Sequence, residues 1–207
     1  MNKINLPFKN HFSKLYTNPK WTIRLCLVLL LSIICALLNK SLTDYSESFK
    51  KIGMSQSEIN DIQGINWLTD SFQGLIQGFL NTFIIFIIFL TISRIMKSKV
   101  STLSVWAASI SYMLITLIIK FIVLVIQKIF GLAVTTVKIT SLNIFKPGDF
   151  YLGVMDLQLF FKVLLIGIIY YYTFQFSKKA TFNWSLIALI VLLFTGLLGA
   201  YISNIFK

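Results

Sequence analysis

Continuous apolar runs of about 20 residues constrain this chain more than any other feature of its sequence. Each run is long enough for an α-helix to cross about 30 Å of hydrocarbon. A membrane β-strand would instead alternate apolar and polar residues over about 10 positions. The sequence therefore predicts an all-α, polytopic membrane protein with five transmembrane helices. The predicted spans are 21–38, 74–93, 103–126, 152–176 and 182–205.

The composition supports a membrane location. Of 207 residues, 57% are hydrophobic and 13% charged, whereas a soluble domain has about 45–50% and about 25%. We expect one membrane domain, 21–207, preceded by a basic segment, 1–20. The net charge of +12 would suggest nucleic acid in a soluble protein. Here the basic residues flank apolar runs, so the lipid bilayer is the expected partner and nucleic acid is not.

Basic residues are distributed unevenly among the segments that join the spans. The segment up to Arg24 and the loops 94–101 and 178–179 hold ten basic and no acidic residues. The other two connections hold six basic residues and six of the seven acids, and Lys207 after the last span brings the basic residues on that side to seven. Cytoplasmic loops carry an excess of Lys and Arg. The N-terminus is therefore predicted in the cytoplasm and the C-terminus outside the cell membrane.

Two further helices are expected outside the spans. In segment 1–20, Phe8, Phe12, Leu15 and Tyr16 share one helical face, which predicts an interfacial helix on the inner leaflet. In the first outer loop, Ser55 to Glu58 fits a capping box. Apolar residues then recur every three to four positions up to Phe72, which predicts an amphipathic helix on the outer membrane surface or on the bundle. The loop 127–151 is expected to form a short β-like excursion or a turn.

Ionisable residues inside the predicted spans are candidates for function, because burying charge in lipid is costly. Helical rise places Asp156, Lys120 and Lys162 about 6, 9 and 15 Å below the outer surface. They could share a polar pocket, with an Asp156–Lys120 ion pair. Alternatively, each lysine snorkels to the interface.

Catalytic groups are not evident. The single histidine, His11, has no Cys, Asp or Glu at ligand spacing, and no phosphate-binding GxxxxGK[ST] loop occurs. We expect a protein that is not an enzyme and that needs no metal or cofactor. Cys26 and Cys35 are interpreted as small packing residues.

Small residues within the spans predict close helix packing. These residues are Gly74, Gly78, Gly167, Gly196 and Ala200. The first outer loop offers a different kind of candidate, an acidic surface for a cationic peptide. Its candidate contacts are Asp44, Glu47, Glu58, Asp61, Trp67 and Asp70.

Several motifs are shared with one family. They are Phe12 with Asn18-Pro19-Lys20-Trp21, Met54-Ser55-Gln56-Ser57-Glu58-Ile59, Gly74 and Gly78, Ser111-Tyr112, Asp156-Leu157-Gln158-Leu159-Phe160 through Gly167, and Ser177-Lys178-Lys179-Ala180. Together they make nearly the whole chain resemble the bacterial branch of the Yip family (Ypt/Rab-interacting proteins). Two features depart from that family: Met113-Leu114-Ile115 stands where it has a proline, and Lys120 and Lys162 are not its hallmarks.

The resemblance implies a non-enzymatic, five-helix membrane domain. Some bacterial members accompany ABC-type exporters, so the leading hypothesis is an accessory or scaffold subunit that docks on an exporter permease and its ATPase. Export of, or resistance to, a membrane-active antimicrobial peptide would follow. One alternative is a stand-alone bacteriocin-type immunity protein that binds a cationic peptide at the outer leaflet. Another is a small-solute transporter that uses Asp156 and Lys162.

Overall fold

The computed structural model describes residues 8–44 and 46–205, apart from the side chains of residues 47, 48, 51 and 63. Its secondary structure is helical, in the order α1 (Lys9–Thr17), α2 (Thr22–Ser41), α3 (Ser46–Lys51), α4 (Gln56–Gln63), α5 (Trp67–Ile95), α6 (Thr102–Ile129), η1 (Leu142–Phe145), η2 (Leu152–Val154), α7 (Leu157–Tyr172) and α8 (Lys178–Ile205). The two η elements are short 3-10 helices.

Four helices are long and apolar enough to cross a membrane: α2, α5, α6 and α8. They correspond to the predicted first, second, third and fifth spans. The predicted fourth span differs, because α7 covers only 16 residues, or about 24 Å of helix. The predicted start of this span is a separate turn, η2, and its predicted end continues as non-helical chain after Tyr172.

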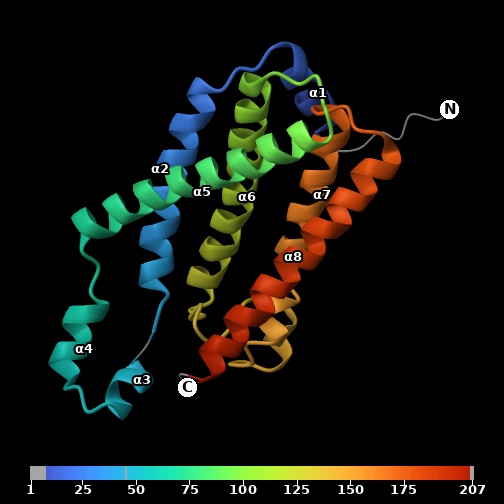
Figure 1. Ribbon diagram of the computed structural model, residues 1–207. Helices are drawn as coiled ribbons and strands as arrows, with labels where there is room; N and C mark the ends of the chain where they lie inside the picture. Colours follow the sequence, from blue (N-terminus) through green and yellow to red (C-terminus); the bar gives the residue numbers. More distant parts are fainter. Residues whose placement is uncertain (1–7, 45, 206–207) are drawn as a thin grey trace.

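The helices form two packed groups. The first consists of α2, α5 and α6, with α5 crossing the other two obliquely (Figure 1). The second pairs α7 with α8, and α6 contacts α7 between the groups. The main core lies near the end that holds α1. There Phe89, Tyr112, Tyr170 and Phe174 make edge-to-face or tilted ring contacts at 5.7–5.8 Å, the geometry that aromatic pairs prefer.

The predicted N-terminal helix is present as α1, and its apolar face packs on the other helices of the protein. Phe12 and Leu15 are 0% and 1% exposed, and α1 contacts α6 and α7. The hydroxyl of Thr173 donates a hydrogen bond to the Phe12 carbonyl at 2.9 Å. Because its apolar face is buried against neighbouring helices, α1 is a structural part of the bundle.

The amphipathic pattern of the first outer loop forms parts of two helices. The predicted capping box is present, because Ser55 and Glu58 cap each other at the start of α4. The helix then ends at Gly64, and the Asn66 side chain accepts a hydrogen bond that starts α5. Trp67 therefore belongs to the long helix α5, and the single continuous helix expected up to Phe72 is wrong.

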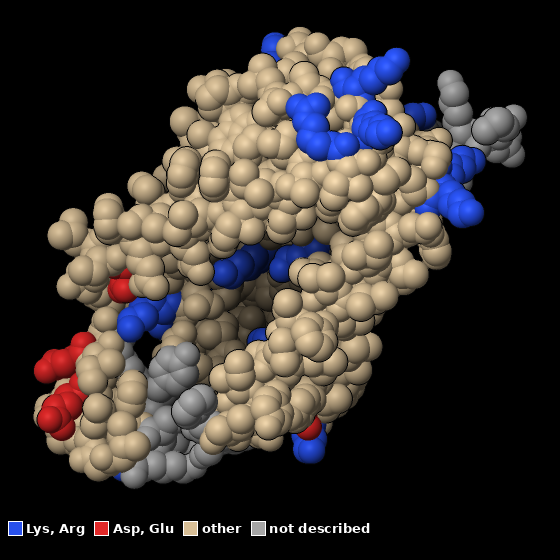
Figure 2. Space-filling view, viewed as in Figure 1, with Lys and Arg blue, Asp and Glu red and all other residues tan. Residues whose placement is uncertain are grey.

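The loop between α6 and α7 contains η1 and η2 and forms no regular strand among its described residues. The expected β-like excursion is reduced to one isolated antiparallel bridge between Ser141 and Asp156. On the visible face, basic side chains gather at the upper end and the acidic ones lie toward the lower end, where some basic side chains lie beside them (Figure 2).

Candidate functional site

A cavity of about 360 Å³ lies between η2, the first turns of α7 and the last third of α8. This volume is within the range of roughly 300–1,000 Å³ that is usual for ligand pockets. Its apolar lining includes Phe150, Val154 and Leu159. Its charged and polar lining consists of Lys138, Asp156, Gln158, Lys162, Thr195 and Ser203. The cavity thus combines an apolar wall with a polar one.

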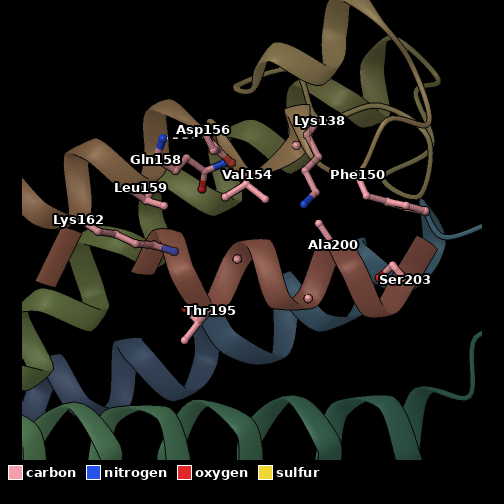
Figure 3. Close-up of a pocket in the computed structure, with 13 residues that line it drawn as sticks. Lys138, Phe150, Val154, Asp156, Gln158, Leu159, Lys162, Thr195, Ala200 and Ser203 are labelled. Atoms are coloured by element: carbon pink, nitrogen blue, oxygen red, sulfur yellow. Dashed lines mark hydrogen bonds between the residues drawn. The ribbon is translucent and has the colours of Figure 1, made fainter. Parts of the chain in front are cut away.

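Lys162 reaches the cavity from α7. The helix begins at Leu157 because the Asp156 carboxylate caps it, accepting a hydrogen bond from the Gln158 amide at 2.8 Å. Asp156 therefore serves first as a helix cap, which is a common role for aspartate at this position. Lys162 is five residues into α7, or about 8 Å from its start. Its side chain extends toward α8 (Figure 3).

Lys138 enters from the opposite side, out of the α6–α7 loop (Figure 3). Its backbone amide donates to the buried side-chain oxygen of Asn143 at 3.1 Å. The Asn143 amide group donates in turn to the Asp149 carbonyl at 2.8 Å. Because one buried side chain joins both halves of the loop, the position of Lys138 is well defined.

The same loop is tied to the helices on either side of it. Gln127, 3% exposed near the end of α6, donates to the Val137 carbonyl at 2.8 Å. Gln158, in the first turn of α7, donates to the Thr140 hydroxyl at 3.0 Å. The loop, residues 130–156, is therefore held in a defined conformation, and we call it the α6–α7 plug. Lys138 was not among the predicted site residues, because its position depends on these hydrogen bonds between distant parts of the chain.

The cavity carries excess positive charge. Its lining includes two ammonium groups and one carboxylate, and that carboxylate already caps α7. Neither Lys138 nor Lys162 forms an ion pair with a described residue. Lys162 lies within electrostatic range of the Asp156 carboxylate and also of the Lys120 and Lys138 ammonium groups. Cations that are not paired within the protein attract an anion, so the site is chemically suited to bind one.

The three predicted pocket residues are only partly brought together. Asp156 and Lys162 line the cavity, whereas Lys120 does not. The predicted Asp156–Lys120 ion pair is wrong, since neither residue forms an ion pair with any described residue. Lys120 lies nine residues before the end of α6, or about 14 Å along that helix, whereas Lys162 lies about 8 Å from the start of α7.

Two of the predicted packing glycines lie where α5 crosses α2. A Cβ added at Gly74 would lie 2.8 Å from the Ala36 Cβ, and one added at Gly78 would lie 2.6 Å from the Ser32 Cβ. These distances are too short for a side chain, so both glycines allow the helix backbones to approach closely.

The other small residues lie around α7 and α8. A Cβ at Gly167 would lie 3.0 Å from the Ser185 hydroxyl, and one at Gly196 would lie 2.8 Å from a methyl group of Val154. Ala200 is 6% exposed and lines the cavity together with Gly196. Gly199 also lines it, but nothing lies within 4 Å of a Cβ added there.

The acidic residues of the first outer loop are largely engaged in local hydrogen bonds. The Glu58 carboxylate accepts from the Ser55 amide at 2.8 Å and its hydroxyl at 2.7 Å. Asp70 accepts from the Asn66 amide at 2.9 Å. In the same way, Asp44 accepts from the Ser46 amide at 2.9 Å. These carboxylates therefore start helices, although they remain charged.

Three other predicted contacts of that loop have different surroundings. Asp61 is exposed on α4, and Trp67, 67% exposed, begins α5. The side chain of Glu47 lies outside the described residues. The described members of this set are not among the residues that line the cavity.

The described residues contain no group of three or more His, Cys, Asp and Glu side chains that could hold a metal ion. His11 is half-buried, and its Nε2 atom is buried without a hydrogen-bond partner in the described chain. Comparison with family models, curated proteins and solved structures found no match to this chain.

Proposed function

We propose that this chain is a non-enzymatic, multi-pass protein of the cell membrane that binds an anionic group in the cavity between α7 and α8. The observation that carries this proposal is the convergence of Lys138 and Lys162 on one cavity (Figure 3). Among the described lining residues the one carboxylate is Asp156, which caps α7 and remains charged, so the two lysines leave the lining with one excess positive charge. Charge-assisted hydrogen bonds from ammonium groups to an anion are about twice as strong as neutral ones.

The proposed topology has five membrane-crossing helices, with α7 as the short fourth span. A helix of about 24 Å is acceptable where neighbouring protein covers its ends, because the backbone there is not exposed to lipid. The η2 turn and the α6–α7 plug cover one end of α7, and α1 contacts the helix. Basic residues before α2, between α5 and α6 and before α8 favour a cytoplasmic N-terminus and an external C-terminus.

Inorganic phosphate is a suitable probe of the proposed site. The purified protein in a neutral detergent should gain thermal stability from sodium phosphate relative to sodium chloride at equal ionic strength, because a ligand of the folded state stabilises it. Lys138→Gln and Lys162→Gln should each reduce this gain. Lys179→Gln, an exposed lysine at the far end of α8, is the matched control. An equal gain in all four proteins would refute the proposed function.

A second candidate role is that of an accessory subunit of an ABC-type exporter. It is favoured by α8, in which Ala200 is the only buried residue among those described. The helix packs mainly on α7 and η2, so much of its surface is available to a partner helix. Co-purification with a permease and an ATPase from native membranes in mild detergent would support this role. Purification of the chain alone under those conditions would refute it.

A further inference from the structure

We propose that the anion is the phosphate of an anionic phospholipid from the outer leaflet, with its acyl chains lying against the exposed side of α8. This inference rests on the proposed function and specifies its ligand. The shared chemistry is a phosphate group held by Lys138 and Lys162, and a free phosphate is the competing source. The shape, depth and lining of the cavity favour the lipid.

The cavity is open at its side because α8 lacks bulk there. Gly196 and Gly199 have no side chains, and nothing lies within 4 Å of a Cβ placed at Gly199. Figure 2 shows a deep hollow in the visible face, with Lys or Arg side chains along its upper edge and deeper inside it. In a membrane, such an opening faces lipid, so a lipid can reach the cavity without crossing the protein.

The depth of the lysines also favours a lipid ligand. Lys162 lies about 8 Å along α7 from its start, and in the proposed topology that start faces the outer leaflet, so the ammonium group lies within the bundle. A charge at such a position is costly unless it is paired. A lipid phosphate supplies the counter-charge while its chains stay in the hydrocarbon. A free phosphate would have to give up much more of its hydration to reach the same place.

The two-sided lining matches an amphiphile. Lys138 Nζ lies close to the backbone of Gly153, since a Cβ added there would be 3.7 Å away. Beside the two ammonium groups, Phe150, Val154 and Leu159 provide an apolar wall. A headgroup phosphate would contact the lysines, and the start of an acyl chain would contact this wall. No described carboxylate beyond the capping Asp156 is present in the lining to attract the positive end of a zwitterionic headgroup.

The test measures which lipid stays with the protein. The full chain is reconstituted in nanodiscs of phosphatidylglycerol and phosphatidylcholine in equal amounts, released into mild detergent, and examined by native mass spectrometry. We expect the unmodified protein to retain phosphatidylglycerol preferentially. Gly199→Leu should lose this preference by filling the cavity without changing any charge. In the double variant Lys138→Gln/Lys162→Gln, the preference for phosphatidylglycerol over phosphatidylcholine should fall about tenfold or more. The loss of one hydrogen bond to a charged group changes affinity by about that factor.

Folding controls and alternative results complete the test. Gly199→Ala is a milder variant at an open helical position, and it should fold normally and retain the lipid partly. Lys179→Gln should retain it fully. If phosphate stabilises the protein but phosphatidylglycerol is not retained over phosphatidylcholine, the site takes a soluble anion and this inference fails while the proposed function stands. If neither effect occurs, both fail. Equal retention by the unmodified protein and Gly199→Leu would place the lipid elsewhere and also overturn the inference.

Discussion

The crossing of α2 and α5 depends on the absence of a side chain at Gly74, so Gly74→Ala should destabilise the protein. The added Cβ would lie 2.8 Å from the Ala36 Cβ and 3.0 Å from the Ile33 Cα. Ordinary contact begins at 3.4 Å, so the helices would have to separate by roughly 0.6 Å (3.4 minus 2.8). Neither neighbouring atom can move by a change of rotamer, so the backbone itself must shift.

The expected size of the effect follows from two opposing terms. Forcing an extra methyl group into a packed contact costs about 1–3 kcal/mol. Alanine in a helix is more favourable than glycine by about 1 kcal/mol. The net loss of unfolding free energy should therefore be about 1 kcal/mol. Gly199→Ala makes the same chemical change in open space, so it should stabilise the protein by up to about 1 kcal/mol.

Reversible unfolding in mixed micelles, followed by tryptophan fluorescence and circular dichroism, measures both variants. The helix-propensity term cancels between them, so their difference isolates the packing term of about 1–3 kcal/mol. Adding Ala36→Gly to Gly74→Ala should recover part of the lost unfolding free energy, because Ala36→Gly removes the Cβ atom that makes the shortest contact. Equal unfolding free energies for Gly74→Ala and Gly199→Ala would refute the close approach of α2 and α5.

Three further predictions concern α1, the α6–α7 plug and α4. Burial, and to a smaller extent the Arg24 guanidinium, lowers the pKa of His11. The stability this residue contributes is therefore present above its unfolded-state pKa of about 6.5 and is lost as the pH falls through the lower folded-state value. Thermal melts between about pH 7 and 5 should show this loss, and His11→Gln should reduce it. Asn143→Ala should lower the melting temperature, since unsatisfied buried groups cost about 1–3 kcal/mol, and should weaken the response to phosphate because Lys138 loses its anchor. Ser55→Ala should raise hydrogen exchange in α4 by removing a cap worth about 1 kcal/mol, with little effect on global unfolding.

Each of these predictions has an outcome that contradicts it. A pH dependence unchanged by His11→Gln would mean that other groups control acid stability. A normal phosphate response in Asn143→Ala would show that the plug does not position Lys138. Unchanged exchange in α4 of Ser55→Ala would show that its capping box contributes little.

Long apolar runs made α2, α5, α6 and α8 predictable from the sequence to within a few residues at most ends. The start of α5 was the exception. The regular apolar spacing through Phe72 suggested one surface helix, but Gly64 ends α4 and Asn66 starts α5. Periodicity describes which face of a helix is apolar, and it does not show where one helix stops and the next begins.

The cavity was predictable only in part. Asp156 and Lys162 stood out because ionisable residues are rare in apolar runs. Lys138 did not stand out, because its place depends on the hydrogen bonds of Asn143 and Gln127 to distant parts of the loop. The pairing of Asp156 with Lys120 was wrong because α7 begins at its cap, which gives that carboxylate another partner.

The sequence by itself determined that the chain forms long apolar helices, because a backbone in lipid must satisfy its hydrogen bonds within each segment. It also determined which ends of those helices carry basic residues. Tertiary structure alone decided which polar groups meet. Lys138 and Lys162 share a cavity because contacts between distant residues, such as Gln158 with Thr140 and Gly196 with Val154, set the positions of the plug, α7 and α8. Local sequence patterns do not encode such contacts.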